Sequence, residues 1–420
     1  GPGTHTESVH LEGTRKLALE TGRNRLLVTG AVLALAYVVI AARLVQLTLF
    51  EPTLEPRLAR FEPMVPPSLA SSVPPAGTGR ANIVDRNGIV LASSLPTVSL
   101  YADPQDVLDA ADAADRVVTV LPTLHRAEVL AKLRADNRFA WIKRNLTPTQ
   151  HYQVNRLGLP GLSFQNSESR VYPHGREAAH VLGMTDVDGR GISGVEGYFD
   201  RDLRGRTRAL QLSIDIRAQA ILHEELSNAV RTFDAKAASG LVMDVRSGEI
   251  LAMVSLPDFD PNIPASTIDG SDFNSVTKGV YEMGSTFKLF TVAMALDSGA
   301  AKLRGGYDAT DPIRMARFTI SDYHGKNRWL SVPEILIYSS NIGAAKMALD
   351  VGSKAQQRYL RQLGLLSPAF LELPEIGVPL KPARWRDINT MTIAYGHGVA
   401  VSPLQLVDAV STVVNGGIQH

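Results

Sequence analysis

The sequence has no cysteine, which excludes a disulfide framework, a thiolate nucleophile and a cysteine-ligated metal site. It also has little net charge, because 43 lysines and arginines nearly balance 42 aspartates and glutamates. A net charge of +1 lacks the bulk positive charge that nucleic-acid binding requires, so we expect no nucleic-acid partner. The ten histidines form no HExxH motif or other close ligand pair, so we expect no metal and no cofactor.

The chain of 420 residues is long enough for two or three domains with cores of their own. It contains no internal repeat and no low-complexity tract. Gly1-Pro2-Gly3 stands in place of an initiator methionine, and we interpret it as the remnant of a cleaved tag.

One long apolar run lies near the N-terminus. Residues 26–42 carry no charge, and after Arg43 the apolar character continues to Phe50. A helix over residues 26–50 would be about 37 Å long, enough for a hydrocarbon core of about 30 Å. Two alternatives are a buried soluble helix and a cleavable signal peptide, but the length of the run argues against both. We therefore expect a single transmembrane anchor over residues 26–50.

The charges that flank this run predict its orientation. Acidic residues, Glu51 and Glu55, follow the run, whereas basic residues precede it. The basic residues are Arg15, Lys16, Arg23 and Arg25. The positive-inside rule then predicts a cytoplasmic tail over residues 1–25 and places the bulk of the chain outside the cytoplasm. Residues 51–79 are rich in proline, serine and alanine, and we expect a linker there.

A serine and a lysine one helical turn apart mark the most informative stretch, Ser285-Thr286-Phe287-Lys288. It follows Gly284, which permits a tight turn, and precedes an apolar helical run over residues 289–296. A serine in the first turn of a helix lies near free N–H groups and the positive end of the helix dipole, which stabilise an oxyanion. Lys288 can reach back to Ser285, and burial would keep its amine neutral. The pair therefore predicts a nucleophile with its own base.

A second tetrad of the same form, Ser275-Val276-Thr277-Lys278, lies shortly before it. This segment lacks the preceding glycine, and no apolar helix follows it. We expect it to be a polar loop without a catalytic role. Because such a tetrad can occur by chance, the assignment of Ser285 needs support from a second motif.

That support comes from Ser339-Ser340-Asn341, which lies between two helical patterns at residues 333–338 and 342–349. At such a junction the Ser339 hydroxyl could relay a proton to a leaving amine, and the Asn341 carboxamide could hold a substrate amide. The alternative is a helix N-cap, for which serine and asparagine are the usual residues. The presence of Ser285 and Lys288 favours the catalytic interpretation.

These motifs resemble those of the penicillin-binding proteins and serine β-lactamases. Residues 281–288, Y-E-M-G-S-T-F-K, are similar to the Y-E-P-G-S-x-F-K segment of the monofunctional class B penicillin-binding proteins. Residues 339–343 are similar to their S-S-N-x-G, and residues 394–398 with 402–405 to their G-Y-G…T-P-L-Q. The resemblance runs from about residue 26 to the last residue.

One motif of this family is missing from the sequence. The family carries a KTG, KSG or HTG triad on a strand far beyond SxN, and none of these triads occurs here. The triad's strand supplies one oxyanion donor in the family. We therefore expect the catalytic domain to be truncated at its C-terminal end, and the chain as given to be inactive.

The segment before the motifs resembles the membrane-proximal pedestal of the same family. Residues 80–92 predict a strand, an Asn-Gly turn and a second strand, and are similar to the family's R-G-x-I-x-D-R-N-G-x-x-L-A. Residues 170–173, 191–196 and 212–215 match further pedestal segments. We expect the charged residues of these segments to form structural ion pairs between the pedestal and the catalytic domain.

The resemblance implies an α+β fold with a single N-terminal transmembrane helix, an elongated pedestal and a transpeptidase domain. We place the pedestal at residues 80–214 and the transpeptidase domain at residues 215–420. Its antiparallel sheet would have helices on both faces. A helix over residues 218–233, followed by a hairpin between residues 240 and 254, would begin that sheet.

No glycosyltransferase domain fits before residue 215, so the resemblance implies a monofunctional peptidoglycan DD-transpeptidase. Ser285 would attack a stem peptide ending in D-Ala-D-Ala, with Lys288 as base, and an amine of a neighbouring stem would resolve the acyl-enzyme. Ser339 would relay the proton, and Asn341 would position Lys288 and the substrate. β-Lactams would acylate Ser285 as mimics of the donor.

Within the family, Glu282, Asn341 and residues 101–104 favour the enzyme of septal cell division over the enzyme of side-wall elongation. A non-catalytic β-lactam sensor or scaffold is a further alternative, and a secreted β-lactamase is less favoured. The resemblance implies a location in the bacterial inner membrane, with a cytoplasmic N-terminus and a periplasmic catalytic domain. The implied partners are a SEDS-type glycan polymerase and divisome membrane proteins.

Overall fold

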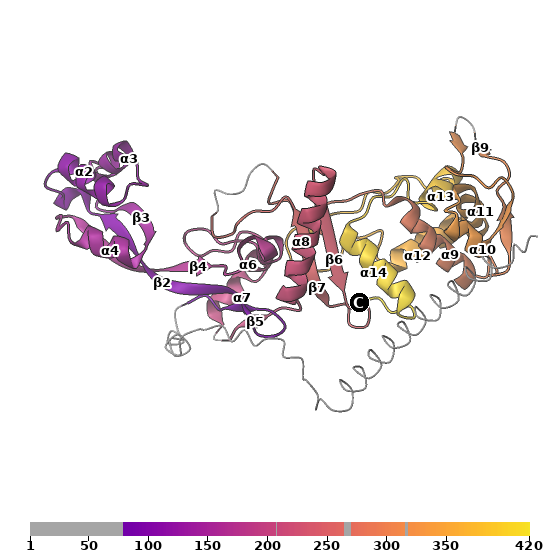
Figure 1. Ribbon diagram of the computed structural model, residues 1–420, viewed down its shortest axis with the longest axis horizontal. Coiled ribbons are helices and arrows are strands. Elements are labelled where there is room, and N and C mark those ends of the chain that lie inside the picture. The colour runs from indigo at the N-terminus through magenta and orange to yellow at the C-terminus, as the bar shows by residue number, and fades with distance from the viewer. Residues whose placement is uncertain (1–78, 207, 264–269, 316–317) are drawn as a thin grey trace, which may run out of the picture. The chain divides into compact units, whose positions relative to one another are not determined.

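The computed structural model describes residues 79–206, 208–263, 270–315 and 318–420. The expected tail, the expected anchor at residues 26–50 and nearly all of the expected linker therefore lie outside the described residues. Within these described ranges, no helix is both long and apolar enough to cross a bilayer. Helices and strands both occur along the described chain (Figure 1), and every described strand pair except one is antiparallel, in agreement with the expected α+β class.

The first part of the described chain is built on one long strand, β2 (Val90–Ala102). β2 pairs antiparallel with β4 (Leu162–Val171) from Ser93 to Ala102, and its last residues, from Val98 on, also pair antiparallel with β3 (Ala140–Leu146). Its first residues pair with β1 (Ile83–Val84), which also pairs in parallel with β5 (Leu210–Gln211). The predicted β1–β2 hairpin is confirmed.

Short helices pack around this sheet. α2 (Ala110–Val120), α3 (Arg126–Leu133) and α4 (Pro148–Asn155) surround one end of β2, where Leu100, Val117 and Ile142 are buried together. The short helix η1 (Pro104–Asp106) lies at the same end, directly after β2, and the helical elements of the other end are η2 (Gly175–Ala178), α5 (Ala179–Leu182), α6 (Gly194–Tyr198) and α7 (Asp200–Gly205).

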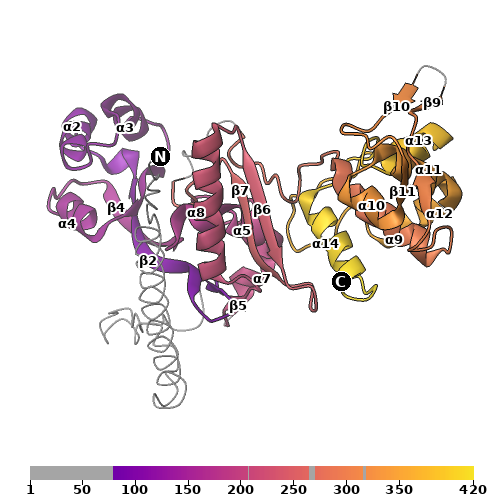
Figure 2. The same ribbon diagram turned by 45° about the vertical axis from the view of Figure 1, so that its right-hand side comes forward.

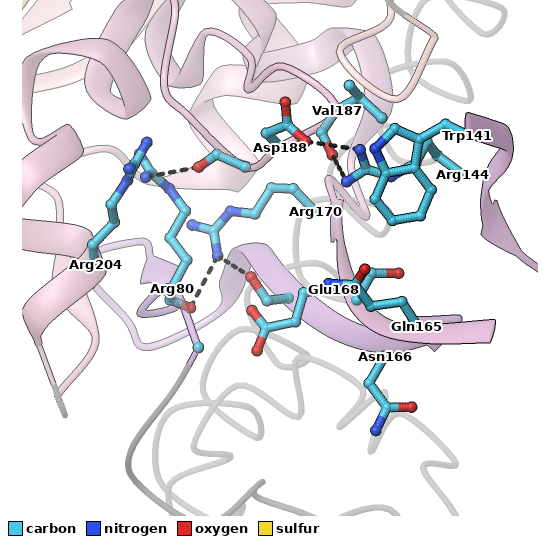
Figure 3. Close-up of a pocket in the computed structure, with 14 residues that line it drawn as sticks. Arg80, Trp141, Arg144, Gln165, Asn166, Glu168, Arg170, Val187, Asp188 and Arg204 are labelled. Atoms are coloured by element: carbon cyan, nitrogen blue, oxygen red, sulfur yellow. Dashed lines mark hydrogen bonds and ion pairs between the residues drawn. The ribbon is translucent and has the colours of Figure 1, made fainter. Parts of the chain in front are cut away.

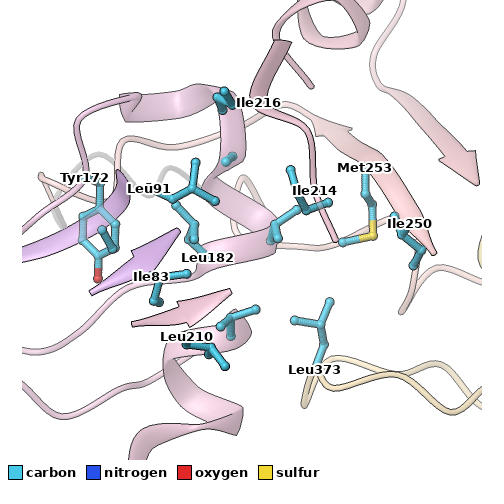
Figure 4. Packing of buried hydrophobic residues seen from close by; sticks show 14 of the residues in the cluster. Ile83, Leu91, Tyr172, Leu182, Leu210, Ile214, Ile216, Ile250, Met253 and Leu373 are labelled. Atoms are coloured by element: carbon cyan, nitrogen blue, oxygen red, sulfur yellow. The ribbon is translucent and has the colours of Figure 1, made fainter. Parts of the chain in front are cut away.

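One apolar core runs across the expected boundary between residues 214 and 215. It joins Ile83 and Leu182 with Ile250, Met253 and Leu373 (Figure 4). Burial of this apolar surface stabilises the contact between the segments before and after the expected boundary.

The buried ion pairs of this region differ in part from expectation. The Glu196 carboxylate is fully buried and pairs with Arg80 at 2.5 Å and with Arg170 at 2.6 Å. Arg80 also contacts Asp200 at 2.8 Å. These partners all belong to the expected pedestal, so the expectation of pairs with the catalytic domain is wrong for them. A sequence match places charged residues in segments but does not tell which segments the fold brings together.

Arg86 behaves as expected, because it pairs with Glu249 at 3.3 Å, although both side chains are partly exposed. The buried carboxylate of Asp85 also reaches beyond residue 214, since it accepts the backbone N–H of Ile216 at 3.3 Å.

The second part of the described chain begins with α8 (Ile216–Phe233), which Asp215 caps through the N–H of Arg217. The predicted hairpin follows as β6 (Ala238–Met243) and β7 (Ile250–Leu256). α8 packs against both strands, and Gly240 permits a close approach, because a Cβ there would lie 2.9 Å from Leu222. α14 (Pro403–Val414) contacts β6, and Figures 1 and 2 show α8 and α14 on opposite sides of the two strands.

The remaining elements surround α9 (Lys288–Asp297), which the short helix η4 (Gly284–Phe287) precedes. They are β8 (Gly306–Asp308), β9 (Ile313–Met315), β10 (Phe318–Ile320), β11 (Trp329–Ser331), α10 (Val332–Ile337), α11 (Asn341–Val351), α12 (Ser353–Gln362) and α13 (Asp387–Ile393). α9 is apolar nearly all round and has a core on each side, one with Val292 and Ala295 and the other with Phe290 and Met294. Burial on both sides fixes the position of Lys288 at its first turn.

Candidate active site

Ser285 lies in η4, one turn before α9, where a glycine and a second chain segment shape the backbone. Gly284 adopts a φ of +57°, which favours glycine, and the predicted tight turn is confirmed. The Gly284 N–H donates to the carbonyl of Gly396 at 3.3 Å. The two glycines approach so closely that a Cβ on Gly396 would lie 2.0 Å from the Gly284 oxygen. Ser285 itself is exposed, and the candidate nucleophile is therefore accessible on a constrained turn.

The segment before Ser285 is held by a clamp formed by residues 396–401. Tyr281 and Val401 exchange two backbone hydrogen bonds, at 2.9 and 3.0 Å. The Glu282 carboxylate accepts the Gly398 N–H at 2.7 Å and lies 3.1 Å from His397 Nδ1. These contacts, the Gly398 N–H first, hold the pKa of Glu282 below its usual value. A charged carboxylate thus joins the two segments.

Lys288 brings the expected residues together. Its side chain is buried, at 1% exposure, and Nζ lies 3.0 Å from Ser285 Oγ. The amine also donates to Ser339 Oγ and Asn341 Oδ1, each at 2.8 Å, and to the Ser339 carbonyl at 2.6 Å. Burial lowers the pKa of Lys288 to about 8, against the opposing effect of Asp322. A substantial fraction of the amine is therefore neutral near neutral pH.

The Ser339-Ser340-Asn341 motif divides its roles between a helix cap and the site. Ser340 is the N-cap of α11, because its Oγ accepts the Gly343 N–H at 2.9 Å. Ser339 has a φ of +54°, an unusual value for serine, and its Oγ donates to Ser285 Oγ at 3.0 Å. The helix N-cap interpretation is therefore correct for Ser340, whereas Ser339 and Asn341 face Lys288.

Sequence reasoning missed the segment that supports this motif. Asp322 accepts the Ser340 hydroxyl at 2.7 Å and the Ile342 N–H at 3.0 Å. The preceding carbonyl, Ser321 O, accepts the Asn341 side-chain N–H at 3.0 Å. The sequence gives a weak signal for this residue, an isolated aspartate between two short strands, and no spacing rule connects it to SxN.

The tetrad Ser275-Val276-Thr277-Lys278 forms a turn, but it is not the solvent-exposed polar loop that we expected. Ser275, Val276 and Thr277 are buried, and Val276 belongs to the core at the domain junction. Lys278 is exposed and lies over the Phe273 ring, with Nζ 5.7 Å from the ring centroid. The tetrad therefore forms no nucleophile–base pair.

A cavity of the described chain lies apart from the candidate catalytic residues. A cavity of about 390 Å³ occurs in the expected pedestal, lined by Arg80, Trp141, Arg144 and Arg170 among others (Figure 3). None of the four candidate catalytic residues lines it. The described residues also contain no cluster of three or more histidine, aspartate or glutamate side chains that could hold a metal ion.

Comparison with known proteins agrees with this geometry. Residues 238–420 match the penicillin binding protein transpeptidase domain, and residues 75–230 match the penicillin-binding protein dimerisation domain. The probable peptidoglycan D,D-transpeptidase FtsI of Caulobacter vibrioides is 40% identical over 342 residues, which cover 80% of this chain and 58% of that protein. The chain belongs to the class B penicillin-binding proteins.

Other class B penicillin-binding proteins are similar over the same region. The peptidoglycan D,D-transpeptidase FtsI of Escherichia coli is 32% identical over 379 residues, which cover 82% of this chain and 64% of that protein. The chain thus spans about three fifths of the length of these relatives. The crystal structure of a peptidoglycan synthetase from Bifidobacterium adolescentis has the same fold, with a TM-score of 0.62 and 22% identity over 81% of this chain and 72% of that chain.

Proposed function

We propose that this protein is a peptidoglycan DD-transpeptidase that works through a serine acyl-enzyme. The observation that carries the proposal is the buried Lys288 amine, 3.0 Å from Ser285 Oγ and with a pKa of about 8. A lysine that loses its proton near neutral pH can serve as the base for a serine nucleophile. The donor is a stem peptide ending in D-Ala-D-Ala, and β-lactams acylate the same serine.

In the acylation step, neutral Lys288 takes the proton of Ser285 Oγ while Oγ attacks the penultimate carbonyl carbon. The Ser285 N–H, at the start of the helical segment, stabilises the oxyanion. The bond between the carbonyl carbon and the leaving nitrogen then breaks. Lys288 returns its proton to the leaving amine through Ser339 Oγ, which lies within 3.0 Å of both Lys288 Nζ and Ser285 Oγ.

The second half of the reaction uses the same groups in reverse. An acceptor amine from a neighbouring stem peptide attacks the acyl carbon and gives up its proton along the Ser339–Lys288 path. Ser285 Oγ leaves and recovers its proton from Lys288. Asn341 would have two functions: its Oδ1 accepts a hydrogen bond from Lys288 and orients the amine, and its carboxamide would hold a substrate amide.

Within the family we assign the protein to septal cell-wall synthesis, with the role of an elongation enzyme as the alternative. The names of the relatives from Caulobacter vibrioides and Escherichia coli, both FtsI, support the septal assignment. The intact Ser285, Lys288, Ser339 and Asn341 constellation gives no support to a non-catalytic sensor or scaffold.

We further propose a pedestal over residues 80–214 and a transpeptidase domain over residues 215–420. An anchor over residues 26–50 would hold them on the periplasmic side of the bacterial inner membrane, as the flanking charges suggest. The partners would be a SEDS-type glycan polymerase and divisome membrane proteins.

Labelling of the full-length protein with a fluorescent penicillin, followed by peptide mass spectrometry, tests the activity. The expected adduct is on Ser285. An adduct on another residue, or no adduct under conditions where a known penicillin-binding protein is labelled, would contradict the proposal.

A further inference from the structure

The loop between β10 and β11 holds the Ser339–Asn341 turn in place. Two consecutive residues of this loop, Ser321 and Asp322, contact three consecutive residues of the turn and helix. The Asp322 carboxylate uses one oxygen for the Ser340 hydroxyl and the other for the Ile342 N–H. Both oxygens are thus engaged, and the carboxylate lies at the N-terminus of α11, where the helix dipole favours a negative charge.

These contacts determine how Asn341 presents its carboxamide. Because the Ser321 carbonyl can only accept, it requires the amide nitrogen of Asn341 on its side. The amide oxygen must then point the other way, and it lies 2.8 Å from Lys288 Nζ. The loop therefore selects the one orientation of the carboxamide in which it accepts from the base.

The same loop supports the unusual backbone of Ser339. A left-handed conformation costs a non-glycine residue energy and persists only where its surroundings hold it. Here the residue that follows, Ser340, is held by Asp322 on its side chain, and its backbone N–H donates to Ile335 at 2.9 Å. Ser339 Oγ thereby stays within 3.0 Å of both Ser285 and Lys288.

We propose that Asp322 is a positioning residue that holds the Ser339–Asn341 turn against Lys288 and that acts on this amine through its negative charge. The inference rests on the proposed function, because it assigns Asp322 a part in tuning the base of that reaction.

The electrostatic part of the inference follows from what surrounds Lys288. Its direct contacts are two hydroxyls, a carbonyl and a carboxamide, all neutral. Burial lowers the pKa of the amine, and the charge of Asp322 opposes that effect. Because no described residue forms an ion pair with the amine itself, the charge of a nearby carboxylate in this poorly solvated site has a large influence on the pKa of Lys288.

Charged and titratable groups on the helices packed against α9 have other partners. Tyr359 of α12 bonds to Asp297 at the far end of α9, and Glu334 of α10 pairs with Arg328. Lys346 of α11 donates to the Asp308 carbonyl, and Asp408 of α14 lies 3.5 Å from the Gln419 amide. On the clamp, Glu282 bonds to Gly398 and His397.

The test measures the titration of Lys288 directly and does not depend on turnover. The full-length protein is labelled with [13C]lysine, and the Lys288 resonance is identified by its loss in Lys288→Met. Asp322→Asn keeps the shape of the side chain and removes the charge. Ser340→Ala removes the Ser340–Asp322 hydrogen bond but keeps the charge, and Asp311→Asn removes an exposed charge that belongs to the same region of sequence.

The expected result is that Lys288 titrates at a lower pH in Asp322→Asn than in the wild type, and close to the wild-type value of about 8 in the two controls. Acylation by penicillin at pH 10, where the amine is neutral in every variant, should still be at least about tenfold slower in Asp322→Asn, because the turn is displaced.

An unchanged Lys288 titration in Asp322→Asn would overturn the inference, and so would an equal shift in either control. The proposed function fails separately, if wild-type protein is not acylated at Ser285. In that case a lowered Lys288 titration in Asp322→Asn alone would still support the electrostatic role of Asp322.

Discussion

Ser339 Oγ donates a 3.0 Å hydrogen bond to Ser285 Oγ across 54 residues of sequence, and the two hydroxyls share the Lys288 amine. One buried amine thus contacts both the proposed nucleophile and the proposed proton relay. The arrangement requires Ser339 to hold a left-handed backbone, with a φ of +54°. In the proposed mechanism, proton removal and proton return would therefore use the same amine.

Substitution of the two tetrads should separate the nucleophile from the buried turn. In a form of the protein that carries the family's KTG strand, Ser285→Ala should abolish fluorescent-penicillin labelling, and Lys288→Ala should slow it by about 10²–10⁴-fold, the usual contribution of a general base. Ser275→Ala and Lys278→Ala are the matched controls and should retain labelling, because that tetrad does not bring its serine and lysine together. Labelling that survives Ser285→Ala but not Ser275→Ala would reverse the assignment.

Acylation should depend on pH through Lys288. The amine acts as a base only when neutral, and its pKa is about 8. The second-order rate constant should therefore rise with pH, fall about tenfold per unit well below pH 8, and reach a plateau above it. Stopped-flow acylation between pH 6 and pH 10 measures the profile. A rate that is flat down to pH 6 would show that the base is another group.

Gly396→Ala should displace Ser285, although the two residues are far apart in the sequence. A Cβ at this position would lie 2.0 Å from the Gly284 oxygen and would push the Ser285 turn out of place. Gly398→Ala is the matched control, because Gly398 has a similar φ of +93° but its nearest added contact would be 3.5 Å away. Acylation should fall by about 10²-fold or more in Gly396→Ala and much less in Gly398→Ala. Equal losses would mean that backbone strain, and not the Gly284 contact, is responsible.

Glu196→Gln should destabilise the fold without touching the active site. This fully buried carboxylate pairs with both Arg80 and Arg170, so its neutralisation leaves Arg80 with Asp200 alone and removes the carboxylate that pairs with the buried Arg170. We expect a loss of about 3–5 kcal/mol in the free energy of unfolding, measured by urea denaturation. Glu249→Gln removes the partly exposed pair with Arg86 and should cost at most about 1 kcal/mol. A comparable cost for the two variants would argue against a structural role of the Glu196 cluster.

A reporter fused after residue 60 should test the membrane topology expected from the sequence. The apolar run at residues 26–50 and its basic N-terminal flank predict that this point lies outside the cytoplasm. An alkaline phosphatase fusion should therefore be active, and a fusion to a reporter that works only in the cytoplasm should not. The opposite pattern would refute the predicted orientation.

The local features of the site were predictable from the sequence. The spacing of Ser285 and Lys288 puts them one turn apart on any helix, and Gly284 marks the turn before it. The two helices around SxN and the β6–β7 hairpin follow from short-range patterns of apolar, capping and turn residues. Such patterns suffice because each depends on neighbours within a few residues.

The relations between distant segments were decided only by the tertiary structure. The sequence could not tell which serine of the Ser339-Ser340 pair caps α11 and which faces Lys288, because that choice depends on a left-handed residue held from outside. Nor could it connect Asp322 to the turn or Glu282 to Gly398, since carboxylates in loops bind whatever donors the fold brings to them. The low pKa of Lys288 has the same origin, because burial of an amine is a property of the packing around it and not of its neighbours in sequence.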